Sequence, residues 1–156
     1  ALEAIADAHR RHGMIQEVII QNFLPASGTP MAAAPAPDRA EMLWSIAAAR
    51  LLLPEEIALQ APPNLADGDY GAYLDAGIND WGGVSPVTPD HINPDHAWPA
   101  IAALAEVTRA RGFALRERLA VHPRFVTSPR AVDSRLRARI AAAVGSDGLP
   151  RESRVA

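Results

Sequence analysis

Cysteine and lysine are both absent from this sequence of 156 residues. Without cysteine, the chain has no disulfide, no thiol nucleophile and no thiolate-held zinc or iron–sulfur cluster within these residues. All 15 basic residues are arginine, so the chain has no amine side chain for Schiff-base catalysis. These absences narrow the chemistry to amide, hydroxyl, imidazole, carboxylate and guanidinium groups.

Long apolar runs and a large excess of one charge are also missing. No run reaches the ~18 residues that span a bilayer, and the N-terminal stretch "ALEAIADAHRRHG" is too charged for a secretory signal. A net charge of −3 provides no basic field for nucleic acid. We therefore expect a cytoplasmic protein with no membrane or nucleic-acid partner. The chain begins without methionine, in what reads as the middle of a helix, so we expect a piece of a longer protein.

Helical and strand-like patterns alternate along the chain. Apolar residues at helical spacing predict helices within residues 1–12, 39–53, 69–77, 97–112 and 133–145. Short apolar or β-branched stretches predict strands at 14–23, 56–62, 78–83 and 113–121. Asp38 followed by Glu41 forms a capping box before the second helix. Alternation of this kind predicts an α/β fold with parallel strands, either half of a barrel or a small open sheet.

Polar residues gather where the predicted strands end, which is where parallel α/β folds place their sites. Gln21 and Asn22 end the first strand, and Gln60 ends the second with Asn64 just beyond. These amides either close the strand ends or bind a polar ligand. The fourth stretch carries Arg116, Glu117 and Arg118, which suit either an ion-paired layer or recognition of a carboxylate or phosphate.

The stretch "GINDWGGVSPVTPDH" (77–91) concentrates special residues at the third strand end. Asp80 either orients a hydroxyl or amine of a ligand or forms an Asx turn beside Gly82. Trp81 either stacks on a planar ligand or packs in the core. The loop that follows includes Asp90, His91 and His96. Its prolines favour a stiff substrate loop or lid over a metal site, although a metal-dependent hydrolase built on residues 90–96 remains an alternative.

Four stretches together resemble one enzyme family. "IQEVIIQNFLPASGTPM" (15–31), "LQAPPNL" (59–65), "GINDWGGVSPVTPDHINPDHAWP" (77–99) and "LRERLAVHPRFV" (115–126) are similar to the deazaflavin synthases. These are radical S-adenosylmethionine (SAM) enzymes that make 7,8-didemethyl-8-hydroxy-5-deazariboflavin. The resemblance is closest to the subunit or domain that closes the ring, covers residues 1–126 and is weak in the tail.

The resemblance implies the C-terminal half of a radical SAM (β/α) TIM-like partial barrel. It implies three regions: 1–128 as the half-barrel, 129–145 as a terminal helix and 146–156 as a linker or disordered tail. The family closes the 8-hydroxy-5-deazaflavin ring from an adduct of tyrosine and 5-amino-6-ribitylaminouracil, with loss of ammonia. It uses SAM and a [4Fe–4S] cluster held by a C-x-x-x-C-x-x-C motif, which we expect upstream because this chain has no cysteine.

The implied partners are the missing N-terminal half of the barrel and a second synthase, either as a subunit or fused as in some actinobacteria. Without its other half, the fragment alone is expected to be inactive, and a non-catalytic half-barrel is the other alternative. The implied roles are as follows: Asp80 and His91 catalytic; Asn22, Asn79, Trp81, Ser85, Asp90 and Asn93 substrate-binding; Gln21, Gln60 and Asn64 cofactor-binding; no metal ligand.

Overall fold

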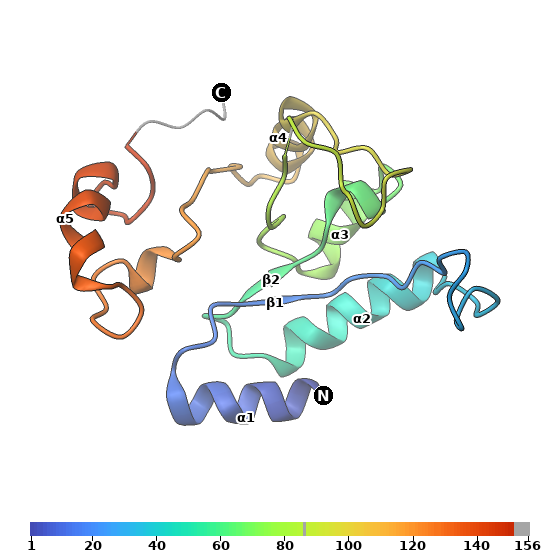
Figure 1. Cartoon of the computed structure of the whole chain (residues 1–156), viewed down its shortest axis with the longest axis horizontal. Helices are drawn as coiled ribbons and strands as arrows, with labels where there is room; N and C mark the ends of the chain where they lie inside the picture. Colours follow the sequence, from blue (N-terminus) through green and yellow to red (C-terminus); the bar gives the residue numbers. More distant parts are fainter. Residues whose placement is uncertain (86, 152–156) are drawn as a thin grey trace. The chain divides into compact units, whose positions relative to one another are not determined.

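The computed structural model describes residues 1–85 and 87–151. It shows two compact units, Ala1–Ala100 and Ile101–Ala156, drawn in sequence colours in Figure 1. The first unit contains, in order, α1 (Leu2–His12), β1 (Glu17–Ile19), α2 (Arg39–Leu52), β2 (Ala58–Gln60), the 3₁₀ turn η1 (Pro63–Leu65) and α3 (Tyr70–Ala76). The second contains α4 (Ile101–Ala110), the 3₁₀ turn η2 (Pro123–Phe125) and α5 (Ser134–Ala143).

The helices form where the sequence predicts them, and their ends have local causes. The Asp38 side chain accepts a hydrogen bond from the Glu41 N–H at 2.8 Å, and the Glu41 carboxylate accepts one from the Asp38 N–H at 2.9 Å, so the predicted capping box is confirmed. α1 ends at Gly13 and α3 at Gly77, both with positive φ, a conformation that glycine adopts without steric cost.

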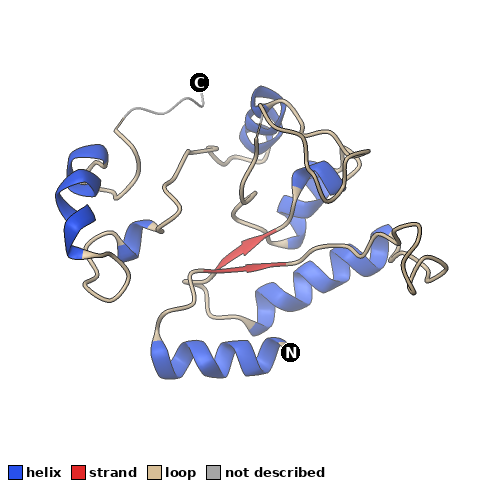
Figure 2. Ribbon diagram, in the orientation of Figure 1, coloured by secondary structure: helices blue, strands red, loops and turns tan. Residues whose placement is uncertain are grey.

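The sheet is smaller than predicted. β1 and β2 pair in parallel, with Ile19 opposite Gln60, and Figure 2 shows them as two arrows running the same way. The third predicted strand contributes one parallel bridge, Gln60 to Asp80. The fold is therefore mixed α/β with two parallel strands and a third segment beside β2. The half-barrel architecture and the boundary at residue 128 stay predictions.

The core of the first unit lies where α2 packs against the β2 region. Ile46 and Ala49 of α2 and Ile57, Leu59 and Ala61 around β2 are all fully buried. Figure 1 shows α1 and α2 on the same side of the two strands. At the end of α1, buried His9 places Nε2 3.2 Å from the Glu56 carboxylate. Because side chains alternate along a strand, the residues that do not face α2 are Ala58 and Gln60.

The fourth predicted strand is wrong. Residues 113–121 form no strand, and the described part of their unit holds only one isolated bridge, Val144 to Pro150. A strand needs a neighbour to satisfy its backbone groups, and the described residues of this unit offer none to the segment. Two of its arginine side chains make contacts within the same unit instead. Arg116 pairs with Asp147 at 3.3 Å, and Arg118 donates to the Leu119 carbonyl.

Across the described residues, the structure shows no helix with the length and apolar character that a membrane crossing requires.

Candidate functional site

The end of β2 meets the end of the third predicted strand, as the alternating pattern predicts, whereas Gln21 and Asn22 after β1 take no part in this contact. Gln60 is 2% exposed, and its Nε2 donates to the Glu17 carboxylate on β1. Asp80 lies beside Gln60 through the parallel bridge. Glu17, Gln60 and Asp80 therefore occupy one strip across the sheet, on the face away from α2. Sequence reasoning missed Glu17, although its strand position, two residues before Ile19, would have placed it on this face.

Gly82 lets the third segment approach β2 closely. A Cβ atom built on Gly82 would lie 2.9 Å from Gln60 Oε1, and the φ of Gly82 is +71°. The Glu17 carboxylate holds one end of the Gln60 amide, and the Gly82 backbone closes over the other. The Gln60 amide therefore has a fixed orientation. The sequence alone does not predict this orientation.

Asn79 and Asp80 have different surroundings. Asn79 Oδ1 accepts a hydrogen bond from the Leu59 N–H at 2.8 Å, so this amide fastens the third segment to β2. Asp80 Oδ1 accepts from the Gly82 N–H at 2.6 Å, which is the Asx turn considered from the sequence. The turn leaves a carboxylate at the strand ends. The catalytic role of Asp80 and the ligand role of Asn79 stay predictions.

Asn64 connects the end of β2 to the following loop. It is 7% exposed, and its Nδ2 donates to Asp90 Oδ2 at 2.9 Å and to the His96 carbonyl at 3.3 Å. Asp90 also accepts from the Ile92 N–H and from both nitrogens of Asn93. These hydrogen bonds, led by the Asn93 side chain, lower the pKa of Asp90 to about 2. The hydrogen bonds among Asp90, Asn93 and Asn64, called the latch below, hold the loop against the end of β2. The contacts of Asp90 and Asn93 with substrate stay predictions.

The remaining predicted residues lie around this strip. Trp81 is buried and meets Tyr70 edge-to-face, with ring centroids 5.8 Å apart. Ser85 Oγ lies 2.6 Å from Thr88 Oγ1 within its loop. Gln21 and His91 are exposed, and none of the contacts above includes them. The structure therefore brings Gln60 to Asp80 and Asn64 to Asp90, but gives no reason to pair Asp80 with His91.

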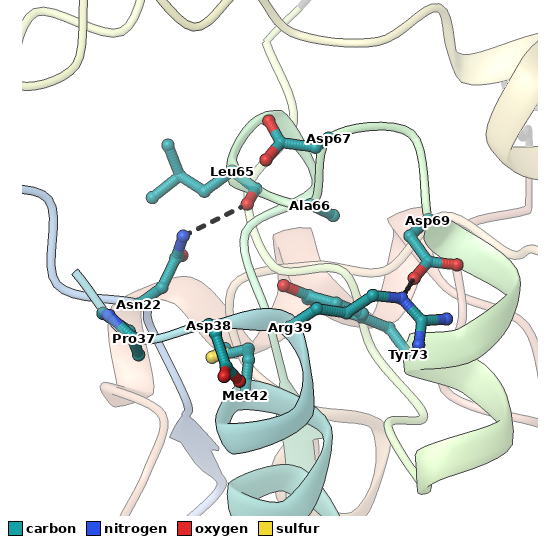
Figure 3. Close-up of a pocket in the computed structure, with 10 residues that line it drawn as sticks. All are labelled: Asn22, Pro37, Asp38, Arg39, Met42, Leu65, Ala66, Asp67, Asp69 and Tyr73. Carbon is teal, nitrogen blue, oxygen red and sulfur yellow. Dashed lines mark hydrogen bonds and ion pairs between the residues drawn. The ribbon is translucent and has the colours of Figure 1, made fainter.

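A cavity of about 340 Å³ lies beyond the ends of β1 and β2 (Figure 3). Its walls come from the segment after β1, the start of α2, the turn after β2 and the start of α3. The lining residues are Asn22, Pro37, Asp38, Arg39, Met42, Leu65, Ala66, Asp67, Asp69 and Tyr73. Sequence reasoning named only Asn22 among them. Asp67 and Asp69 lie in the turn that follows the second predicted strand. Their position shortly after a strand end was the sequence feature that could have identified them.

Of the two implied cofactors, SAM suits the residues of this chain better than the iron–sulfur cluster does. The sequence has no cysteine, and the described residues contain no group of three or more His, Asp or Glu side chains that could hold a metal ion. An iron–sulfur cluster therefore does not fit on these residues. The strand ends do fit hydroxyl- and amine-bearing groups such as those of SAM. The buried Asn22 Oδ1 and Asn64 Oδ1 have no hydrogen-bond partner in the part of the chain that the structure describes. A buried acceptor without a partner is costly unless a donor reaches it.

The curated proteins that this chain resembles are named as deazaflavin synthases. FO synthase of Streptomyces coelicolor is 45% identical over 99% of this chain. FO synthase of Mycobacterium tuberculosis is 45% identical over 97%. The 7,8-didemethyl-8-hydroxy-5-deazariboflavin synthase of Archaeoglobus fulgidus is 51% identical over 81%. No protein-family model matches the chain, and no solved structure matches it either.

These matches cover only part of each relative. The chain spans 18% of the Streptomyces protein and 38% of the Archaeoglobus protein. At 45 to 51% identity over most of its residues, the similarity reaches every element that builds the strand ends. The chain is therefore homologous to FO synthase and to 7,8-didemethyl-8-hydroxy-5-deazariboflavin synthase, and it corresponds to a fraction of each.

Proposed function

We propose that this chain is part of a radical SAM deazaflavin synthase and contributes to the step that closes the 8-hydroxy-5-deazaflavin ring. The substrate is the adduct of tyrosine and 5-amino-6-ribitylaminouracil, and the reaction releases ammonia. The observation that carries the proposal is the 51% identity to a relative named as a 7,8-didemethyl-8-hydroxy-5-deazariboflavin synthase. The polar strand ends of this chain support it, because they provide a place for a polar ligand.

The cofactors supply the hydrogen-abstracting radical when they are bound in the full-length protein. The cluster needs cysteines that this chain lacks, so residues of the full-length protein outside this chain are its expected site. This chain supplies the position and surroundings of the substrate. Reactions of this type depend on orientation and on exclusion of water. Buried Gln60 and the latched Asn64 loop can provide both.

Asp80 is the proton-handling residue in this proposal. Its carboxylate lies at the end of the third segment, next to Gln60, and the Gly82 N–H fixes one of its oxygens. A carboxylate held in this way can take the proton that ring closure releases. Asn22 binds a neutral donor of the substrate or of SAM in this proposal and does not have to change its protonation state, whereas buried Gln60 shapes the surface on which the ligand lies.

The partners in this proposal are the rest of the polypeptide and the second synthase activity. A non-catalytic half-barrel remains an alternative reading of the isolated chain. The metal-hydrolase alternative gains no support from the described residues, because the oxygens of Asp90 accept hydrogen bonds from its own loop and from Asn64.

Reconstitution of the full-length protein with its cluster tests the proposed step. The enzyme is supplied either with the preformed tyrosine adduct or with tyrosine and 5-amino-6-ribitylaminouracil separately, and the ring-closed product is measured by mass spectrometry. We expect product from the preformed adduct. An enzyme whose product is the open adduct, with no further ring closure, would show that this chain belongs to the other step.

A further inference from the structure

The cavity beyond β1 and β2 has the size and shape of a small-ligand site. Its volume of about 340 Å³ is at the lower end for ligand pockets. Figure 3 shows the Asn22 amide and the Tyr73 ring entering it from opposite walls, with the Tyr73 hydroxyl on the side that faces Asn22. The two polar groups frame a space that suits a narrow polar chain.

Asn22 provides an acceptor without a donor. Its Nδ2 donates to the Leu65 carbonyl at 3.3 Å, which orients the amide. Its Oδ1 is buried and has no partner among the described residues. A buried acceptor in this state destabilises the fold, and a ligand hydroxyl or N–H would remove that cost.

Asp67 and Tyr73 indicate that the same wall is adapted to a ligand. Asp67 has φ of +47°, the one positive value found at a non-glycine residue in the described chain; aspartate tolerates this conformation in turns, and the turn places Asp67 in the cavity wall. Burial, then the charges of Asp67 and Asp69, raise the pKa of Tyr73. Its phenol therefore keeps its proton at neutral pH and can both donate and accept.

The charges around the cavity select against anions. Asp38, Asp67 and Asp69 line it, while Arg39 is its only lining cation among the described residues and is paired with Asp69. Phosphate and carboxylate groups would meet uncompensated negative charge. Neighbouring donors and acceptors on the walls suit groups that do both, and hydroxyl is the common group of that kind.

We propose that this cavity binds an uncharged, hydroxyl-rich chain, with Asn22 Oδ1 and the Tyr73 hydroxyl as two of its contacts. Together with the proposed function, on which this assignment rests, the chain is the ribityl part of the substrate. Asn22 was expected to contact substrate from the sequence resemblance. The polyol specificity and the roles of Tyr73, Asp67 and the acidic wall come from the structure.

Equilibrium binding to the cluster-free full-length protein tests the assignment without catalysis. The probes are the ribityl-bearing 8-hydroxy-5-deazaflavin, the same ring with methyl in place of ribityl, and the ribityl form phosphorylated at its terminal hydroxyl. The variants are Tyr73→Phe and Asn22→Leu. Tyr70→Phe is the matched control, because Tyr70 contacts Trp81 and does not line the cavity. Thermal unfolding of every variant verifies that each is folded.

We expect the wild type to prefer the ribityl probe over the methyl probe and over the phosphorylated probe. Tyr73→Phe and Asn22→Leu should each reduce the ribityl preference about threefold to tenfold, the effect of one hydrogen bond, whereas Tyr70→Phe should retain it. Equal affinity of the wild type for ribityl and methyl probes, tighter binding of the phosphorylated probe, or full preference in both folded cavity variants would overturn the assignment. Failure of the proposed function has a different signature: ribityl preference without formation of any deazaflavin by the reconstituted enzyme.

Discussion

Substitution of Gly82 by alanine adds one methyl group and tests how closely the third segment approaches Gln60. In Gly82→Ala the new Cβ would lie 2.9 Å from Gln60 Oε1, and alanine would have to adopt a φ of +71°. The backbone conformation and the displaced amide together should lower the free energy of unfolding by about 1 to 3 kcal/mol. Urea denaturation measures this change.

Gly83→Ala is the matched control for Gly82. Nothing lies within 4 Å of its Cβ position, and its φ is outside the positive range. Its unfolding free energy should stay within about 0.5 kcal/mol of wild type. Equal stability of the two variants would show that the third segment does not pack on Gln60 as described.

Asp90 should make stability depend on pH at the acidic end. Hydrogen bonds from Asn93, the Ile92 N–H and Asn64 lower its pKa from 3.8 to about 2. Because the folded pKa is the lower one, Asp90 contributes stability above about pH 4, and that contribution is lost as the pH falls toward 2. Asp90→Asn removes the titration, so its acid unfolding curve should be flatter over this range than that of wild type.

An NMR titration of the Asp90 carboxyl carbon measures the same effect directly. A midpoint near the ordinary value of 3.8 would contradict the latch between Asp90, Asn93 and Asn64. Asp95 lies in the same loop and is exposed, so the acid unfolding curve of Asp95→Asn controls for a general effect of losing a charge there.

Residue identities predicted part of the candidate site. The strand-end rule found Gln60, Asp80 and Asn64, because the carboxyl ends of parallel strands meet at one edge. It could not find the Arg39–Asp69 pair, whose residues are 30 positions apart and meet only when α2 and α3 pack. It also could not show that Asn79 binds the Leu59 N–H whereas Asp80 binds the Gly82 N–H. These bonds depend on how the third segment packs and turns, which residue types alone do not determine.

At the scale of elements, α2 depends on its N-terminal cap. The Asp38 carboxylate accepts the Glu41 N–H, and Glu41 returns the bond to the Asp38 N–H. Asp38→Ala should lower the unfolding free energy by about 0.5 to 2 kcal/mol, whereas Asp38→Asn should retain most of the stability because asparagine also caps helices well. Chemical denaturation of both variants measures the difference, and equal losses would contradict a capping role.

All five helices were predictable as elements, whereas of the four predicted strands two formed, a third contributed one bridge and the fourth did not form in the described residues. Helix signals are local: the capping residues, the period of apolar positions and the terminal glycines all lie within the segment. A strand depends on its neighbours, so "MIQEVIIQNF" yields only Glu17–Ile19 as β1. The segment 113–121 has the composition of a strand but finds no pairing partner among residues 101–151 of its unit, and it stays irregular.

At the scale of the whole molecule, the absence of cysteine means that, in the proposed function, residues outside this chain hold the iron–sulfur cluster. This chain alone, exposed to iron and sulfide and then desalted, should hold no stoichiometric iron, because thiolate ligands are missing. Iron analysis by atomic absorption checks this, with the full-length protein as the positive control. Stoichiometric iron on the chain alone would point instead to ligands from its histidines and carboxylates.

The central claim is that the polar strand ends of this chain carry chemistry for a deazaflavin synthase, and Asp80 tests it most directly. Asp80→Asn keeps an acceptor for the Gly82 N–H but removes the base, and Asp95→Asn serves as the exposed control.

The decisive measurement is the rate of ring-closed product formation from the tyrosine adduct by the reconstituted full-length protein carrying each variant. We predict that Asp80→Asn lowers this rate about 100-fold or more, while its unfolding free energy stays within about 1 kcal/mol of wild type and Asp95→Asn remains active. A folded Asp80→Asn enzyme that forms product at the wild-type rate would contradict the account.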